Sequence, residues 1–230
     1  MQSEQVETGA AAAGPAVPPA ELEARLRATI AGIDDPWIRR LLERIFAADG
    51  PFWPRFLRAP AARHHHEAYP HGLLEHTMRV TDGVALLAPT IAGVDRDVAV
   101  AGALLHDIGK ADAYEPDPVD PQMSEPGRLE GHIVLGYEIL RRAVDDVEGF
   151  PDATARSLRH VVLSHHGRLE YGSPVVPATR EAILVHHVDD LTARMGIVDR
   201  LERDAAPGAR WTAWDRAVGG AVRLGPARST

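Results

Sequence analysis

The chain of 230 residues contains no cysteine, which excludes disulfide bonds, thiolate metal ligands and a cysteine nucleophile. It has no run of about 18 or more apolar residues, so no membrane-spanning helix is expected. Its first ten residues, MQSEQVETGA, lack the basic start and apolar centre of a secretory signal. These absences favour a cytoplasmic protein.

The chain also has few positively charged residues: it contains 25 Lys and Arg against 33 Asp and Glu, which gives a formal net charge of −8. A protein that grips a long phosphate backbone is usually basic, so bulk charge does not support extended nucleic-acid binding. Divalent cations bound inside a cleft can reverse the local sign of the charge.

Strand-rich segments are absent, and the apolar residues follow helical spacing instead. They do so over residues 20–31, 36–46, 72–87, 95–106, 131–144, 152–164 and 178–195. With 45% hydrophobic residues, the chain is long enough for one sizeable core. We therefore predict an all-α helical bundle.

The predicted organisation has four parts. Residues 1–19 are rich in Ala, Gly and Pro and are expected to form a disordered tail. Residues 20–60 form N-terminal helices that pack on a main domain over residues 61–204, and residues 205–230 form a tail in which Trp211 and Trp214 pack. Residues 111–129, with four prolines, form a long loop that is either a lid or a plain surface excursion.

The chemistry of the chain centres on residues 101–110, AGALLHDIGK, where an apolar helix ends in His106 and Asp107. The imidazole offers one nitrogen to a metal ion, and the two carboxylate oxygens can bridge to a second ion. Gly109 permits a tight turn, after which Lys110 faces the same space as a cation suited to phosphate.

The other candidate ligands all lie on predicted helices or at helix ends: His76, His132, His165, His166 and Asp189. Seven ligands exceed the need of one ion, so two divalent ions bridged by Asp107 would use them well, with Mn, Fe, Ni, Zn and Mg left open. The alternative is one ion, with His132, His165 and His166 as polar core.

Several neighbouring polar residues are assigned away from the metal. Asp190 is expected to be solvated beside Asp189, and His160 is expected to face elsewhere. Of the three adjacent histidines at residues 64–66, at most one is expected to face the site, because neighbours on a chain point in different directions.

Five motifs carry a family resemblance: HEAYPHGLLEHT, ALLHDIGK, GRLEGHI, LSHHGRLEYGSPVVP and HHVDDLTARM. Together they resemble the HD phosphohydrolase superfamily, and in particular the HD domain of YhaM-type 3′–5′ exoribonucleases, over about residues 30–214. The resemblance places His76, His106, Asp107 and Asp189 on the four defining positions. It places His132, His165 and His166 on the further positions of the two-metal branch, and Lys110 on the lysine of its HDxGK form.

The resemblance implies a phosphodiesterase that cleaves the 3′ ends of single-stranded RNA or short oligonucleotides with a metal-activated hydroxide. The chain departs from it in lacking room for an N-terminal OB-fold domain, in His71 where a small residue is common, and in Thr192 where a second acid is frequent. A nucleotide or cyclic-dinucleotide phosphohydrolase is the alternative, although no Gly-Tyr-Pro follows as in HD-GYP enzymes. A hypothesis of another class is a non-catalytic module that binds a nucleotide or a partner protein.

Overall fold

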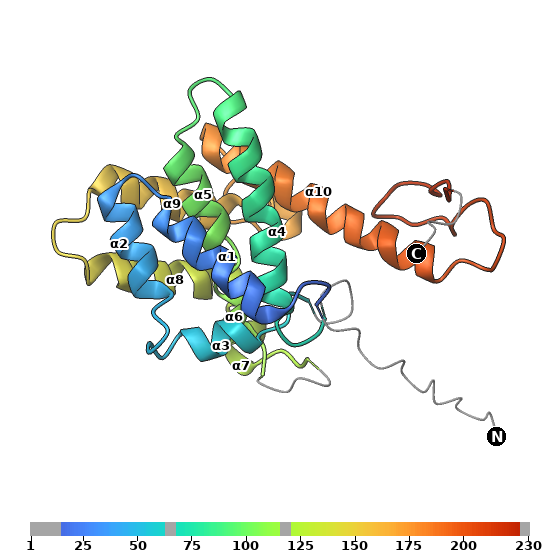
Figure 1. The fold of residues 1–230 in the computed structure, drawn as a ribbon, viewed down its shortest axis with the longest axis horizontal. Helices are drawn as coiled ribbons and strands as arrows, with labels where there is room; N and C mark the ends of the chain where they lie inside the picture. Colours follow the sequence, from blue (N-terminus) through green and yellow to red (C-terminus); the bar gives the residue numbers. More distant parts are fainter. Residues whose placement is uncertain (1–14, 63–67, 116–120, 226–230) are drawn as a thin grey trace.

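The computed structural model describes residues 15–62, 68–115 and 121–225, and within these ranges the chain forms an all-α bundle, as predicted (Figure 1). Its helices are α1 (Pro19–Ala31), α2 (Pro36–Ile45), α3 (Trp53–Arg58), α4 (Gly72–Leu87), α5 (Arg96–Leu105), α6 (Lys110–Ala113), α7 (Glu125–Leu129), α8 (Gly131–Asp145), α9 (Asp152–Ser164) and α10 (Arg180–Arg203), with 3₁₀ turns η1 (Ala88–Thr90) and η2 (Leu169–Tyr171). The only extended pairings in the described part of the chain are isolated bridges.

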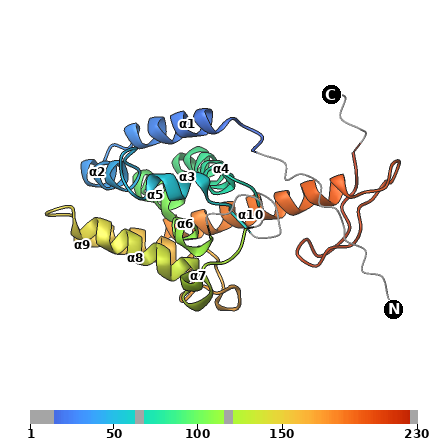
Figure 2. The same cartoon turned by 90° about the horizontal axis from the view of Figure 1, so that it is seen from below.

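Helix α5 forms the centre of the bundle, since every residue from Val98 to Leu105 is buried. It packs against α4, α9, α10 and α2. Figure 2 shows α4 and α5 between α1 on one side and α8 and α9 on the other. A helix buried in this way over most of its length is held in a fixed position, and so is the His-Asp pair that follows it.

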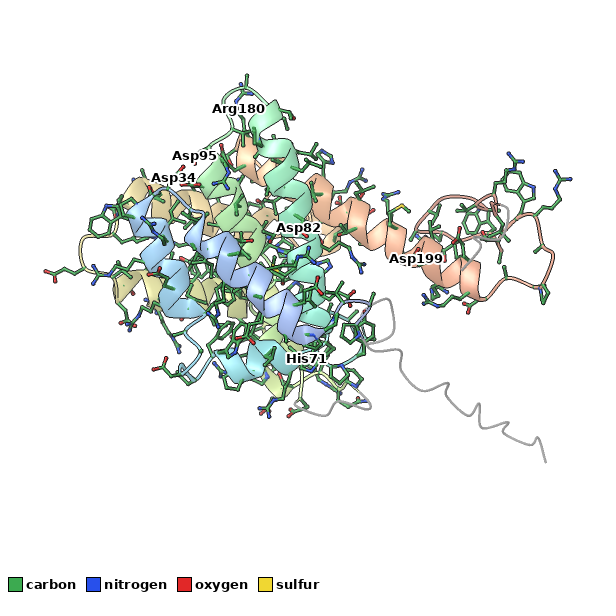
Figure 3. The ribbon with its side chains drawn as sticks, viewed as in Figure 1. Asp34, His71, Asp82, Asp95, Arg180 and Asp199 are labelled. Atoms are coloured by element: carbon green, nitrogen blue, oxygen red, sulfur yellow. The ribbon has the colours of Figure 1, made fainter. Side chains whose placement is uncertain are left out.

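The start of α5 is fixed by the side chain of Asp95. Its Oδ1 accepts hydrogen bonds from the amides of Asp97 and Val98 at 3.0 and 3.1 Å, which satisfies two otherwise unpaired helix donors. The amide of Asp95 donates in turn to Glu181 of α10 at 2.8 Å. Figure 3 shows Asp95, Asp34 and Arg180 at one end of the bundle.

Replacing Asp95 with alanine is expected to lower the free energy of unfolding by about 1 kcal/mol, because the first turn of α5 loses its cap. Urea denaturation of the variant measures the change. The matched control is Asp34→Ala, since the Asp34 side chain is exposed and caps no helix. Equal stability of the two variants would show that the cap contributes nothing.

Part of the loop expected over residues 111–129 is helical. Pro126 lies in the first turn of α7, where a proline is tolerated, and Ser124 caps that helix by accepting from the amide of Gly127 at 3.0 Å. The segment also contains one isolated antiparallel bridge, between Tyr114 and Met123. The prolines thus mark a helix start as well as a loop.

The apolar stripe expected along the last helix is wrong in part. Leu184 and Val188 are buried, whereas Ile183, Leu191 and Met195 are each about half exposed. For Met195 the reason is visible in Figure 1, where the second half of α10 extends beyond the other helices. The prediction that Trp211 and Trp214 pack in the C-terminal tail is also wrong, since they are 57% and 66% exposed.

The N-terminal part of the chain contacts the bundle earlier than expected. The amide of Ala16 donates to the buried carboxylate of Glu75 at 3.2 Å, and Val17 packs against the core. Residues 1–14 and the histidines at 64–66 lie outside the described residues. Among the described helices, none combines the length and the apolar character needed to cross a membrane.

Candidate metal centre

Five separate helices deliver the candidate ligands to one place inside the bundle. His76 lies on α4, His106 and Asp107 directly follow α5, and His132 lies in the first turn of α8. His165 and His166 directly follow α9, and Asp189 lies on α10. All seven residues named from the sequence are therefore brought together.

The first set of donors consists of His76, His106 and Asp189, whose ligand atoms all lie within 4.8 Å of one another. Nε2 of His76 lies 3.2 Å from Oδ1 of Asp189 and 3.3 Å from Nε2 of His106. Both imidazoles are buried, so these donors face each other across a space shielded from solvent.

The second set consists of His132, His165 and His166, whose ligand nitrogens also lie within 4.8 Å of one another. The rings of His165 and His166 are nearly perpendicular, with centroids 4.5 Å apart. His165 is fully buried, and the other two are partly exposed at the edge of the site.

Asp107 lies between the two sets. Its Oδ2 is 3.3 Å from Nε2 of His76 and 3.3 Å from Nε2 of His106. Its Oδ1 is 3.4 Å from Nε2 of His132 and 3.4 Å from Nε2 of His165. One carboxylate oxygen thus belongs to each set, which is the geometry of a bridging ligand.

The donors fit divalent cations by their hydrogen bonding. Nδ1 of His106, His165 and His166 lies 2.7, 2.8 and 2.6 Å from a backbone carbonyl oxygen, so Nδ1 carries the proton and Nε2 presents its lone pair to the site. Oδ1 of Asp107 and Nε2 of His132 and His165 are buried and make no hydrogen bond within the described structure. Buried polar atoms rarely remain unpaired, so a cation is the partner that their lone pairs fit.

Comparison with known proteins assigns the family. The model of the HD domain matches residues 73–194, which contain all seven candidate ligands and Lys110. This chain belongs to the HD-domain family. The assignment confirms the resemblance read from the motifs and supports the expected class of a metal-dependent phosphohydrolase.

Two curated relatives of this HD protein are similar over most of its length. It is 33% identical over 153 residues to the 3′-5′ exoribonuclease YhaM of Bacillus subtilis (strain 168). The aligned region covers 66% of this chain and 48% of that protein. It is also 33% identical over 171 residues to the 3′-5′ exoribonuclease YhaM of Bacillus velezensis. That aligned region covers 74% of this chain and 52% of the relative. The HD protein thus spans about half the length of these relatives. No solved structure matched it.

The protonation states of the HD site suit metal binding. Burial alone would raise the pKa of Asp107, but Lys110 and His106 hold that pKa well below its usual value, and His76 and His106 do the same for Asp189. Burial lowers the pKa of His132 and of His166. At neutral pH the carboxylates are therefore charged and these imidazoles neutral, which is the form that ligates a cation.

Lys110 forms the closest ion pair in the site, with Nζ 2.6 Å from Oδ2 of Asp107. Burial would lower the pKa of Lys110, but Asp107 raises it, so the ammonium stays charged. Lys110, Asp107 and His76 all line a cavity of about 230 Å³ that opens over the centre. The lysine thus adds a fixed positive charge at the place where a ligand would enter.

Gly109 has a different role from the one predicted. Its φ of −67° lies in the ordinary helical region, so the turn does not need glycine. A Cβ at this position would lie 1.9 Å from the carbonyl oxygen of His132 and 2.4 Å from the amide nitrogen of Gly136. Glycine is required because the chain after the His-Asp pair presses directly against the backbone of α8.

Two residues of the site were not identified from the sequence. His186 donates through Nδ1 to the carbonyl oxygen of His165 at 2.8 Å, and Tyr171 lines the cavity. The signal for His186 was present, because it lies three residues before Asp189 on the same helix face. Asp190, expected to be solvated beside Asp189, is half-buried, is ion-paired with Arg194 at 2.7 Å and lines the cavity over the centre, outside both donor sets. His160 accepts from the amide of Ala178 and belongs to neither donor set.

Proposed function

We propose that this HD protein hydrolyses phosphodiester bonds at the 3′ end of single-stranded RNA or short oligonucleotides. The observation that carries the proposal is the position of Asp107, one oxygen toward each set of imidazole donors and Lys110 beside it. The names of the two YhaM relatives support RNA as the substrate class.

The proposal assigns one divalent ion to each set of donors. His76, His106 and Asp189 would hold the first, His132, His165 and His166 the second, with Asp107 common to both. Bound ions would supply Lewis acidity toward the phosphoryl group and toward an attacking water. The chain contributes the fixed spacing of the donors, since each imidazole whose Nδ1 lies on a backbone carbonyl cannot rotate freely.

The two sets give a prediction about metal stoichiometry. Replacing His132 with alanine is expected to remove about half of the bound metal, because it takes one donor from the second set and leaves the first set whole. Elemental analysis after gel filtration measures metal per chain. His187→Ala, an exposed histidine on α10 outside both sets, is the matched control. Unchanged metal content in the His132 variant would favour one ion with a polar histidine core.

In the proposed reaction, Lys110 stabilises the negative charge that develops on the phosphoryl group. Replacing it with glutamine is expected to lower kcat by about 10²-fold while metal content is kept, since Lys110 is not a member of either donor set. Lys110→Arg keeps the positive charge, so its kcat is expected to fall less than that of the glutamine variant. Steady-state kinetics with parallel metal analysis measures both, and full activity of the glutamine variant would remove Lys110 from the mechanism.

A small substrate is the second candidate, because the cavity over the centre is only about 230 Å³ and the net charge is −8. The candidate is a mononucleotide or a cyclic dinucleotide. The two kinds of substrate are distinguished by how affinity depends on salt. Affinity for RNA should fall more steeply with rising salt, because RNA makes more phosphate contacts.

The test uses purified protein with added Mn²⁺ and a 5′-labelled single-stranded RNA, beside Asp107→Ala. We expect a ladder that shortens from the 3′ end with the wild-type protein and an intact RNA with the variant. The same protein is assayed with nucleotides and cyclic dinucleotides. Turnover of those compounds with no RNA ladder would replace the proposal with the second candidate, and binding without any turnover would favour a non-catalytic module.

A further inference from the structure

The cavity over the metal centre continues into a second and larger one. Tyr171, Asp190 and Ala193 line both, so the two share a wall and form one groove. The second cavity has a volume of about 610 Å³ and is also lined by residues 215–217 of the C-terminal tail. A ligand seated at the metal centre can therefore extend along α10.

The C-terminal side of this groove is anchored to α10 by side chains. Arg194 donates to the carbonyl oxygen of Ala217 at 3.3 Å, and Arg200 pairs with Asp215 at 3.1 Å. Asp215 also accepts from the amide of Ala217 at 2.8 Å, which fixes the turn. Figure 1 shows this tail beside the part of α10 that leaves the bundle, which Figure 3 marks with Asp199.

Tyr171 lies where the two cavities meet, and its side chain is 56% exposed. Its backbone position is tied to the metal centre, because its carbonyl oxygen lies 2.6 Å from Nδ1 of His166. Arg168 stacks above the ring with 5.7 Å between Cζ and the ring centroid. An exposed aromatic ring at a fixed distance from the reacting end of a strand is a platform on which a base can stack.

The charges along the groove leave one cation without an acidic partner. Asp190 is paired with Arg194, and Asp215 with Arg200. Arg216 lines the groove, is exposed, and has no ion pair within the described residues. The charged residues that line this cavity balance, with Arg194 and Arg216 against Asp190 and Asp215. Because Arg200 also pairs with Asp215, the guanidinium of Arg216 is available to one phosphate.

We propose that this groove binds the nucleotides that precede the 3′-terminal nucleotide of a single-stranded RNA, with Tyr171 stacking on a base and Arg216 contacting a backbone phosphate. The inference rests on the proposed function, because it takes the metal centre as the place of cleavage. It makes the preferred substrate an oligonucleotide longer than two residues. The 3′-terminal nucleotide lies in the smaller cavity, and the rest of the strand follows α10 toward the tail.

The test compares two substrates in Mn²⁺: a single-stranded RNA of ten nucleotides, and bis(p-nitrophenyl) phosphate, which is too small to reach the second cavity. The quantity measured is the ratio of kcat/KM for the RNA to kcat/KM for the small diester. Tyr171→Ala is expected to lower this ratio about 10-fold, in the range of base stacking on an aromatic ring. Tyr171→Phe keeps the ring and is expected to stay close to the wild type.

Arg216→Ala is expected to lower the same ratio and to reduce the slope of log(kcat/KM) for RNA against log salt by about 0.7, the value for one phosphate of a single strand. The matched controls are Trp214→Ala and Arg223→Ala, an exposed aromatic and an exposed cation of the same tail that do not line the groove. Neither control is expected to change the ratio.

The outcomes separate this inference from the proposed function. RNA cleavage by the wild type with an unchanged ratio in both groove variants would overturn the groove and leave the proposed function standing. An equal loss on both substrates in Tyr171→Ala would also overturn it, because it would show that Tyr171 acts by holding His166. Hydrolysis of the small diester without RNA cleavage would overturn the proposed function and the inference together.

Discussion

Replacement of Asp107 by alanine is expected to remove metal from both sets of donors and to lower kcat/KM by about 10³-fold or more. The reason is geometric, since its two oxygens face different sets: Oδ2 lies 3.3 Å from Nε2 of His106, and Oδ1 lies 3.4 Å from Nε2 of His165. No other carboxylate of the site faces both sets in the described structure.

The loss of metal and activity in Asp107→Ala must be distinguished from a folding defect, because the mostly buried Lys110 loses its ion-pair partner. An unpaired buried charge is costly, so some loss of stability is expected as well. Asp107→Asn keeps the shape of the side chain, and its metal content and activity are compared with those of Asp107→Ala. Elemental analysis and kinetics on the folded fraction measure the effect.

The matched control for Asp107 is Asp190→Ala, an acid that lines the same cavity but pairs with Arg194 and belongs to neither donor set. It is expected to keep its metal. Normal metal content together with normal turnover in Asp107→Ala would contradict the assignment of this residue as the bridge.

The second large effect is expected at Gly109. Its missing Cβ would lie 1.9 Å from the carbonyl oxygen of His132 and 2.4 Å from the amide nitrogen of Gly136, both backbone atoms of α8. Backbone cannot move aside as a flexible side chain can, so α8 must shift and carry His132 away from the metal. Gly109→Ala is expected to lower the free energy of unfolding by about 3 kcal/mol and to deplete metal from the second set.

Two glycines of the same region serve as controls for this prediction. A Cβ on Gly136 would lie 3.2 Å from the amide nitrogen of Gly109, a tight contact that a small shift relieves. Gly131 has a φ of 77° and open space around it, so an alanine there costs only backbone strain of about 1 kcal/mol. In urea denaturation of the three alanine variants, Gly109→Ala should show the largest loss in the free energy of unfolding. A loss at Gly109 smaller than the loss at Gly131 would contradict the close approach of Gly109 to α8.

Local signals in the sequence were sufficient for the helices that carry the ligands. Asp95 begins α5 through a side-chain cap, and Gly167 follows the histidines after α9 with a φ of 78° that glycine adopts without strain. These signals depend only on residues a few positions apart, and so the sequence placed His106 and His165 at helix ends correctly.

The prediction was wrong where an element depends on its neighbours. Helical spacing along α10 identified an apolar face, but whether Leu191 and Met195 are buried depends on whether another helix covers them. None covers the end of α10 in the described structure, which leaves these side chains about half exposed. The role of Gly109 was misread for the same reason, because the backbone of α8 comes from a distant part of the chain.

By itself, the sequence determined the all-α class, the residues of the candidate metal centre and their family, since these follow from residue type, spacing and local caps. Only the tertiary structure decided how the donors divide into two sets, which oxygen of Asp107 faces each set, and that the cavity continues past Tyr171 along α10. The physical reason is that ligation and groove shape depend on distances of a few ångströms between helices far apart in the chain. Those distances are set by how the apolar faces pack around α5.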